Sequence, residues 1–196
     1  MISSILLAAG LSTRMGQPKA LLDWGGQPLI RYQVEQLREA GCDEVIVVLG
    51  YRADDIHRQI RDLPVRVMFN PRFQFGRAGS LRIGAKAANR DADAIVIANV
   101  DQPRPASFLR RLIEAHESGS VATVPTFHGR RGHPVVVAGW LRPELMEASE
   151  EEQGLRGILR RHADRVAEVE MDELCLLDLN TPEEYENALR QFALAR

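Results

Sequence analysis

Apolar residues along this chain follow two different spacings. Short runs rich in β-branched residues predict strands, whereas apolar residues that recur every three or four positions predict helices. The runs are Ser3 to Ala8, Glu44 to Leu49, Val65 to Phe69, Ala94 to Ala98, Val121 to Pro125 and Pro134 to Ala138. Helical spacing occurs between them, at Leu29 to Ala40, Ile56 to Ile60 and Leu109 to His116. Strands and helices therefore alternate along the chain.

Two of the predicted strands, Val45 to Leu49 and Ala94 to Ala98, are apolar at every position. Such strands are typical of a parallel sheet that helices cover on both faces. We therefore predict a three-layer α/β/α Rossmann-like fold with a mostly parallel central sheet. A chain of 196 residues can bury one sizeable core. Because the sequence shows no repeat, low-complexity tract or long linker, residues 1–196 are expected to form a single domain.

Two helix ends carry typical capping residues. Gly41 follows a helical stretch at the position where a left-handed residue often ends a helix. Near the C-terminus, Thr181 precedes Pro182, and Glu184 lies three residues after the threonine. This order predicts a capping box, and therefore a C-terminal helix that begins there.

Composition and charge exclude several classes of protein. The chain has 25 Lys and Arg against 27 Asp and Glu, so its net charge attracts neither nucleic acid nor an anionic membrane. Cys42 and Cys175 are far apart and lack the paired spacing of a zinc or redox site, so we expect buried thiols. The apolar segment at Met1 to Ala9 is too short for a signal peptide or a membrane span. These features predict a cytoplasmic protein.

The segment after the first predicted strand has the composition of an anion-binding loop. Gly10, Ser12 and Gly16 allow backbone amides to approach a ligand, and Arg14 and Lys19 add two cations at the end of a buried strand. The spacing fits neither the P-loop nor the dinucleotide pattern of three glycines. Phosphate binding is one interpretation, and a surface connection with two solvated cations is the other.

Asp101 follows the apolar strand Ala94 to Ala98, so its carboxylate is expected at the same edge of the sheet as the glycine loop. Magnesium usually takes one or two protein oxygen ligands together with phosphates and water. Asp101 is therefore a candidate Mg²⁺ ligand. The alternative is a turn-forming aspartate before Gln-Pro.

The whole N-terminal string narrows these alternatives. Leu7-Ala-Ala-Gly10-Leu-Ser-Thr-Arg14-Met-Gly16, with Lys19-Ala-Leu-Leu22 shortly after it, resembles the opening signature of the MobA-like NTP transferases, which include molybdenum cofactor cytidylyltransferases and guanylyltransferases. Later segments also resemble elements of that family: Asn70-Pro71, Phe75-Gly76, Ser80-Leu81, Asn99-Val-Asp101-Gln-Pro103, Arg131-Gly-His133-Pro134, Gly154-Leu-Arg156-Gly157 and Asp178-Leu-Asn180-Thr-Pro182. The resemblance covers nearly the whole chain.

The resemblance implies Mg²⁺-dependent transfer of a nucleotide to an acceptor phosphate, with release of pyrophosphate. Arg14 would contact the β- and γ-phosphates, Lys19 would lie near the α-phosphate, and Asp101 would hold the metal. Asn180 would complete the metal site; the cytidylyltransferase pattern usually has aspartate there, so Asp178 remains a substitute. The implied nucleotide-binding residues are Leu7, Ala8, Ala9, Gly10, Ser12, Arg14, Gly16, Lys19, Asn70, Gly76, Ser80 and Asp101.

The expected substrates are CTP and a molybdopterin-type acceptor, with a molybdoenzyme as receiver of the product. At position 9 this chain has alanine, as in the cytidylyltransferase branch, whereas the guanylyltransferases tend to have glycine there. The methyl group of Ala9 would narrow the space beside the base. His133, Arg131 and Arg156 would face the acceptor. A lone histidine in a turn is more often structural, however, and a solvated hairpin tip explains Arg131 equally well. The alternatives are transfer to another small phosphorylated acceptor, such as a sugar or alcohol phosphate, and a non-catalytic molybdenum cofactor carrier or chaperone.

Overall fold

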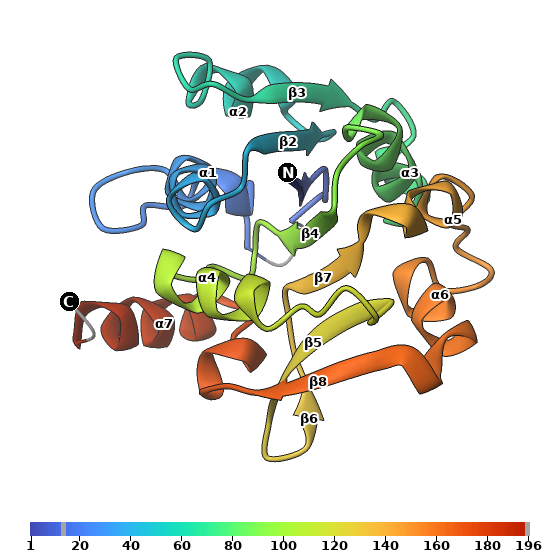
Figure 1. Cartoon of the computed structure of the whole chain (residues 1–196). Helices are drawn as coiled ribbons and strands as arrows, with labels where there is room; N and C mark the ends of the chain where they lie inside the picture. The colour runs from blue at the N-terminus through green and yellow to red at the C-terminus, as the bar shows by residue number, and fades with distance from the viewer. Residues whose placement is uncertain (13–14, 195–196) are drawn as a thin grey trace.

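The computed structural model describes residues 1–12 and 15–194, and it confirms the predicted α/β fold with a mostly parallel central sheet. Helices lie on both sides of the sheet (Figure 1). The strand order is β3-β2-β1-β4-β7-β5-β6, with β8 paired beside β5.

The strands are β1 (Ile2–Ala8), β2 (Glu44–Leu49), β3 (Arg66–Phe69), β4 (Ala94–Asn99), β5 (Ala122–Phe127), β6 (Arg130–Arg131), β7 (Val135–Ala138) and β8 (Val166–Glu170). The α-helices are α1 (Leu29–Glu39), α2 (Ala53–Arg58), α3 (Ala78–Ala87), α4 (Ala106–Glu114), α5 (Arg142–Met146), α6 (Leu155–Arg161) and α7 (Pro182–Leu194). Short 3₁₀ turns connect them, among them η1 (Lys19–Leu21), η2 (Phe73–Phe75) and η5 (Glu173–Leu176).

One strand near the middle of the sheet, β7, runs opposite to both of its neighbours. β3, β2, β1 and β4 run parallel, so their carboxyl ends meet at one edge. β7 then runs antiparallel to β4, and β5 runs antiparallel to β7. Because open α/β sheets bind ligands at the carboxyl ends of parallel strands, this edge of β1 and β4 is where a substrate is expected.

Successive residues of the inner strands supply two separate cores. Val45 and Val47 of β2 face one side, where they belong to a cluster with residues of α1, α4 and α7. Ile46 and Val48 face the other side, in a cluster with residues of α3, α5 and α6. Figure 1 shows the same division of the helices between the two faces. The period of two along a strand therefore explains the three layers.

Both predicted helix caps are present. Gly41 has φ 104° just after α1, which is the left-handed conformation that favours glycine. At the start of α7, the Glu184 amide donates to Thr181 Oγ1 at 3.2 Å. The Glu184 carboxylate accepts from the amides of Asn180 and Thr181, each at 2.9 Å. This reciprocal set is a capping box.

Several details of the fold were not predicted from the sequence. The strands β6 and β8 lack a clear local pattern, because β6 has only two residues and β8 is part-exposed, with polar residues between its apolar ones. Helix α3 begins at Ala78, so Ser80 lies within its first turn. Trp140 is 51% exposed.

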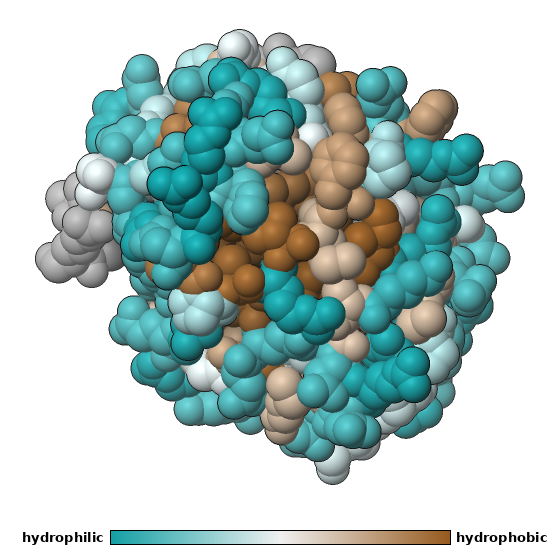
Figure 2. Space-filling model, turned by 90° about the horizontal axis from the view of Figure 1, so that it is seen from above, coloured by the Kyte–Doolittle hydropathy of each residue, from teal (hydrophilic) through white to brown (hydrophobic). Residues whose placement is uncertain are grey.

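The remaining surface and core features fit the composition. Cys42 and Cys175 are free and buried, as predicted. Across the described ranges, none of the helices has the length and apolar character needed to span a bilayer. Seen from above (Figure 2), apolar residues gather near the centre of the face and polar residues surround them.

Candidate active site

A cleft of about 340 Å³ opens at the carboxyl ends of β1 and β4. It brings together these predicted site residues: Leu7, Ala8, Ala9, Gly10, Ser12, Lys19, Gly76, Ser80, Asp101 and Asn180. They come from the start, the middle and the end of the chain. The fold therefore assembles in one place most of the motifs that the sequence singled out.

Three polar side chains meet in this cleft. The Lys19 ammonium donates to Asp101 Oδ2 at 2.9 Å and to Asn180 Oδ1 at 3.0 Å. The side chains of Lys19 and Asp101 are only 12% and 9% exposed, so water screens their attraction weakly. The Arg77 guanidinium approaches the same Asp101 oxygen at 3.9 Å. One carboxylate, one amide oxygen and the Lys19 ammonium thus meet at the floor of the cleft, with the more exposed Arg77 guanidinium beside them.

The loop that carries Asp101 is held by backbone contacts on both sides. The Val100 amide donates to the Leu7 carbonyl at 3.0 Å, and the Leu179 amide donates to the Asp101 carbonyl at 2.8 Å. From α1, the buried Gln33 amide donates to the carbonyls of residues 99 and 100 at 3.1 Å. These bonds fix Asp101 between the first strand and the segment that leads to Asn180.

The N-terminal loop positions Lys19 through Ser12. Ser12 has φ 54°, a left-handed conformation, and its Oγ accepts from the Lys19 amide at 3.0 Å. Gly16 also has a positive φ, of 71°, but it does not line the cleft. Arg14 lies outside the described residues, so its predicted contact with the phosphates stays a prediction.

The opposite wall comes from the segment between β3 and α3. Asn70 is buried and does not line the cleft; its amide donates to Ser80 Oγ at 2.9 Å. Gly76 has φ 105°, and the Glu150 carboxylate lies where a Cβ on that glycine would be. The same carboxylate accepts from the Ala78 amide at the start of α3. Asn70 therefore supports Ser80 from behind.

A second cavity of about 400 Å³ adjoins the cleft, and both share Leu7, Arg77 and Asn99 in their walls. Two predicted acceptor residues, His133 and Arg156, line this second cavity. The structure therefore provides two adjoining spaces.

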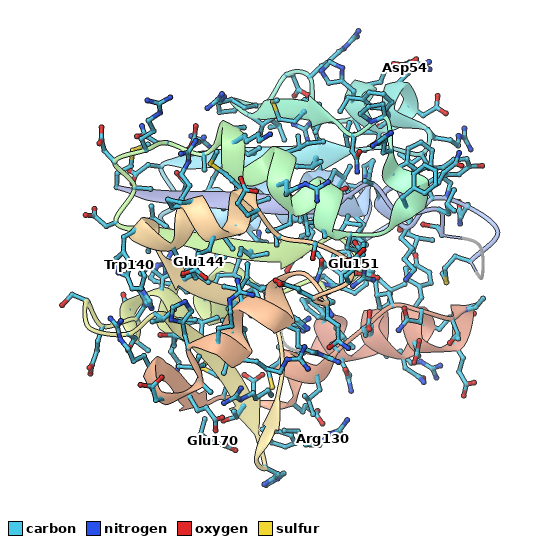
Figure 3. All side chains as sticks on the ribbon, turned by 90° about the vertical axis from the view of Figure 1, so that its right-hand side faces the viewer. Asp54, Arg130, Trp140, Glu144, Glu151 and Glu170 are labelled. Carbon is cyan, nitrogen blue, oxygen red and sulfur yellow. The ribbon has the colours of Figure 1, made fainter. Side chains whose placement is uncertain are left out.

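Arg131, the third predicted acceptor residue, lines neither space. Its guanidinium pairs with Glu168 of β8 at 2.6 Å. Its neighbour Arg130 lies at the end of the molecule opposite Asp54 of α2 (Figure 3). The structure thus separates Arg131 from His133 and Arg156.

Electrostatics keep His133 neutral at neutral pH. Burial lowers the pKa of its imidazole, and the nearby Arg104 guanidinium lowers it further. A neutral imidazole can donate one hydrogen bond and accept another, which suits a polar contact more than a salt bridge with a phosphate. Any anion in the second cavity would therefore rely for its charge neutralisation on Arg77 and Arg156.

The oxygen ligands in the cleft fit a hard divalent cation. Asp101 and Asn180 both direct a side-chain oxygen at the same ammonium nitrogen, so the two oxygens already surround a positive charge. Among the described residues, no three His, Cys, Asp or Glu side chains form a metal-binding group. Asp178 is coupled by charge to Arg104 and His133, whereas Asn180 bonds directly to Lys19. Asn180 is therefore the better placed partner for Asp101.

Several residues of this site were not predicted from the sequence. Arg77 lines both cavities, and Phe73 and Gln74 of η2 line the cleft. Gln33 belongs to an amphipathic helix, where a polar residue is expected to face solvent. A helical wheel of α1 offers one signal, because Gln33 falls between Leu29 and Leu37 on the buried face.

Comparisons with known proteins identify the family of this chain. The family model for the MobA-like NTP transferase domain matches residues 4–166. Nicotine blue oxidoreductase of Paenarthrobacter nicotinovorans is 32% identical over 168 residues, which is 82% of each chain. Molybdenum cofactor cytidylyltransferase of Escherichia coli strain K12 is 26% identical over 195 residues, which is 97% of each chain.

Solved structures extend the similarity to the whole fold. A nucleotidyl transferase from Methanothermobacter thermautotrophicus has a TM-score of 0.85 and 27% identity, and the match covers 100% of this chain and 99% of that one. A protein of Mycobacterium tuberculosis H37Rv in complex with manganese has a TM-score of 0.75 and 27% identity, with 96% and 98% covered. The chain therefore belongs to the MobA-like NTP transferase family and is a nucleotidyltransferase.

Proposed function

We propose that this nucleotidyltransferase transfers CMP from CTP to a molybdopterin-type acceptor in a reaction that requires Mg²⁺. The observation that carries the proposal is the meeting of Lys19, Asp101 and Asn180 at the floor of a cleft that adjoins a second cavity. Two substrates need two adjoining spaces, and a triphosphate needs cations and a metal between them.

The residues of the cleft would act by positioning and charge. In this proposal Asp101 and Asn180 hold Mg²⁺, and Lys19 turns from them toward the α-phosphate. Arg14 would neutralise the β- and γ-phosphates with its planar fork. The bound metal would supply further neutralisation of the phosphates during in-line attack by the acceptor phosphate. No protein nucleophile is required, because the acceptor oxygen forms the new bond to phosphorus as pyrophosphate leaves.

Two observations support the preference for CTP: the side chain of Ala9 and the similarity to a cytidylyltransferase. Ala9 lines the cleft, where its methyl group would narrow the space beside a base. The Escherichia coli molybdenum cofactor cytidylyltransferase aligns with nearly the whole chain. For the acceptor, His133 and Arg156 are proposed contacts, and Arg131 would join them only if the β5–β6 hairpin moved. A molybdoenzyme is the proposed receiver of the product.

A thermal-shift screen of CTP, GTP, UTP and ATP, each with and without Mg²⁺, tests the donor. We expect the largest rise in melting temperature with CTP and Mg²⁺, because a ligand that binds only the native state stabilises it. A larger shift with GTP would contradict the CTP preference and leave nucleotidyl transfer standing.

Release of pyrophosphate tests the reaction itself. We expect CTP, molybdopterin and Mg²⁺ together to release pyrophosphate, and omission of any one to stop it. If the protein binds CTP but releases no pyrophosphate with molybdopterin, it is either a carrier or an enzyme for another phosphorylated acceptor. A panel of sugar and alcohol phosphates distinguishes the two, because only an enzyme would release pyrophosphate with one of them. A dye-reducing or dye-oxidising activity without pyrophosphate release would instead favour the chemistry in the name of the Paenarthrobacter nicotinovorans relative.

A further inference from the structure

Arg104 is a charged side chain in an unusual place. It follows the Asp101-Gln-Pro segment, yet it is only 1% exposed. Buried arginines usually pair with a carboxylate, because removing an isolated charge from water costs several kcal/mol in real proteins. Within the described part of the chain, Arg104 has no ion pair that meets the distance of a salt bridge. Its burial therefore needs another explanation.

The guanidinium instead bonds to four backbone carbonyls. Nε donates to the His133 carbonyl at 3.0 Å, and Nη1 donates to the Pro103 carbonyl at 2.8 Å. Nη2 donates to the carbonyls of Cys175 and Leu177, each at 3.0 Å. A planar fork with five N–H groups can bind several acceptors in fixed directions, which a lysine ammonium cannot do.

These carbonyls belong to segments that each lead to a candidate site residue. Pro103 follows Asp101 in the loop after β4. The His133 carbonyl belongs to the residue that lines the second cavity. Leu177 lies three residues before Asn180, on the segment that also bonds to the Asp101 backbone. One side chain thus ties together the metal side and the acceptor side of the cleft.

The charge of Arg104 is largely retained. Burial lowers the pKa of its guanidinium to about 10, which still leaves it protonated at neutral pH. Asp178 acts on it through space, and Asp178 Oδ1 is a buried oxygen without a hydrogen-bond partner among the described residues. Since no carboxylate pairs directly with it, the positive charge remains available to orient carbonyl dipoles and to favour anions nearby.

We propose that Arg104 is a positioning residue of the transfer reaction. Its four hydrogen bonds to backbone carbonyls hold the segments of Asn180 and His133 in fixed positions relative to Asp101. The proposal rests on the proposed function of the cleft. It assigns Arg104 no contact with either substrate. It predicts that Arg104 matters for metal binding and for turnover, and much less for nucleotide binding on the side of Ser12 and Ala9.

The test compares Arg104→Lys and Arg104→Met with Arg110→Met, in which an exposed arginine of α4 with one backbone bond is replaced. Affinity for Mn²⁺ in the presence of CTP is measured by electron paramagnetic resonance, and CTP affinity without metal by calorimetric titration. We expect both Arg104 variants to bind Mn²⁺ about tenfold or more weakly and to lose kcat by a similar factor, while CTP affinity changes less than about threefold. Lysine should not rescue the loss.

The variants also keep the proposal open to failure. Melting temperatures show whether each variant folds. If Arg104→Met does not fold, the test relies on Arg104→Lys alone, because lysine retains the positive charge and the aliphatic part of the side chain. Wild-type Mn²⁺ affinity and kcat in Arg104→Lys would overturn the proposal, and so would an equal loss of CTP and Mn²⁺ affinity, which would indicate general loosening. If wild type released no pyrophosphate, the proposed function would fail, but the Mn²⁺ measurement would still report whether Arg104 positions Asn180.

Discussion

At the scale of single residues, the contact between Lys19 and the two oxygen ligands determines how the cleft can be loaded. The ammonium occupies the space between Asp101 and Asn180, at 2.9 and 3.0 Å. A divalent cation at these oxygens has to displace it, and the displaced ammonium is then free for a phosphate. Binding of metal and positioning of Lys19 are therefore expected to be linked.

We predict that Lys19→Ala binds Mn²⁺ more tightly than wild type when no nucleotide is present, by about tenfold, because the competing cation is gone. The same variant should lose most of its turnover, because the α-phosphate loses a positive charge. Paramagnetic resonance of Mn²⁺ measures the first effect and pyrophosphate release the second. Lys86→Ala, which removes an exposed lysine of α3, is the matched control. Weaker Mn²⁺ binding in Lys19→Ala would show that Lys19 supports the ligands more than it competes with metal.

Asp101→Ala is predicted to lower turnover by at least about a thousandfold, because the carboxylate proposed to hold Mg²⁺ is lost. The fold should persist, since Asp101 contributes no apolar packing; the melting temperature measures this. Asp54→Ala is the control, because Asp54 projects from α2 at the edge of the molecule (Figure 3). Turnover at the wild-type rate in Asp101→Ala would remove this carboxylate from the site.

At the scale of elements, the start of α7 links stability to the site. The capping box at Thr181 directly follows Asn180, and the Glu184 carboxylate accepts from the Asn180 amide. The helix cap therefore fixes the backbone of a proposed metal ligand. A change of the cap should affect both the free energy of unfolding and metal binding.

Thr181→Ala is expected to lower the free energy of unfolding by about 0.5–2 kcal/mol, the usual cost of losing a capping hydroxyl. Urea denaturation measures this change, and Mn²⁺ affinity should fall with it. Ser107→Ala, at an exposed serine in the first turn of α4, removes a hydroxyl of similar size and should change neither value. A stable Thr181→Ala protein with weaker Mn²⁺ binding would still support the link; unchanged Mn²⁺ affinity would not.

The elements also show what a sequence can predict. The apolar runs located β1, β2, β4 and β7 to within a residue or two, because these strands are buried on both faces. The two-residue strand β6 is defined only by its pairing with β5, and two residues are too few to show a strand pattern in the sequence. Two kinds of information predicted that Lys19, Asp101 and Asn180 lie close together. One is the family resemblance, and the other is that the carboxyl ends of parallel strands meet at the same edge of a sheet. Arg104 could not be identified as buried, since three of its four carbonyl partners, those of His133, Cys175 and Leu177, lie far from it in the chain.

At the scale of the whole molecule, histidines determine how stability changes with pH near neutrality. Burial lowers the pKa of His116 and of His133 below the ordinary value of 6.5. The unfolded chain therefore binds protons at these residues before the native protein does. The stability that these two neutral histidines contribute is therefore complete above pH 6.5 and is lost as the pH falls below that value.

We predict that the free energy of unfolding decreases between about pH 7 and pH 5, and that His116→Gln has a shallower slope in this interval. Glu44 and Glu144 have lowered pKa values, so their contributions are lost only at more acidic pH. Urea denaturation across the interval measures the slope. Between about pH 7.5 and 8.5 neither state protonates histidine, so the two proteins should there have equal slopes. Equal slopes below pH 6.5 as well would contradict the assignment to His116.

The bonds of Lys19 also have a consequence for synthesis of the chain. Asp101 lies 82 residues beyond Lys19, and Asn180 lies 161 residues beyond it. Closing loops of this length costs conformational entropy that only the completed fold can repay. A chain still emerging from the ribosome with residue 180 inside the exit tunnel has no complete polar centre. Consumption of nucleotide would thus begin only after residue 180 has left the exit tunnel, because the proposed site needs Lys19, Asp101 and Asn180 together.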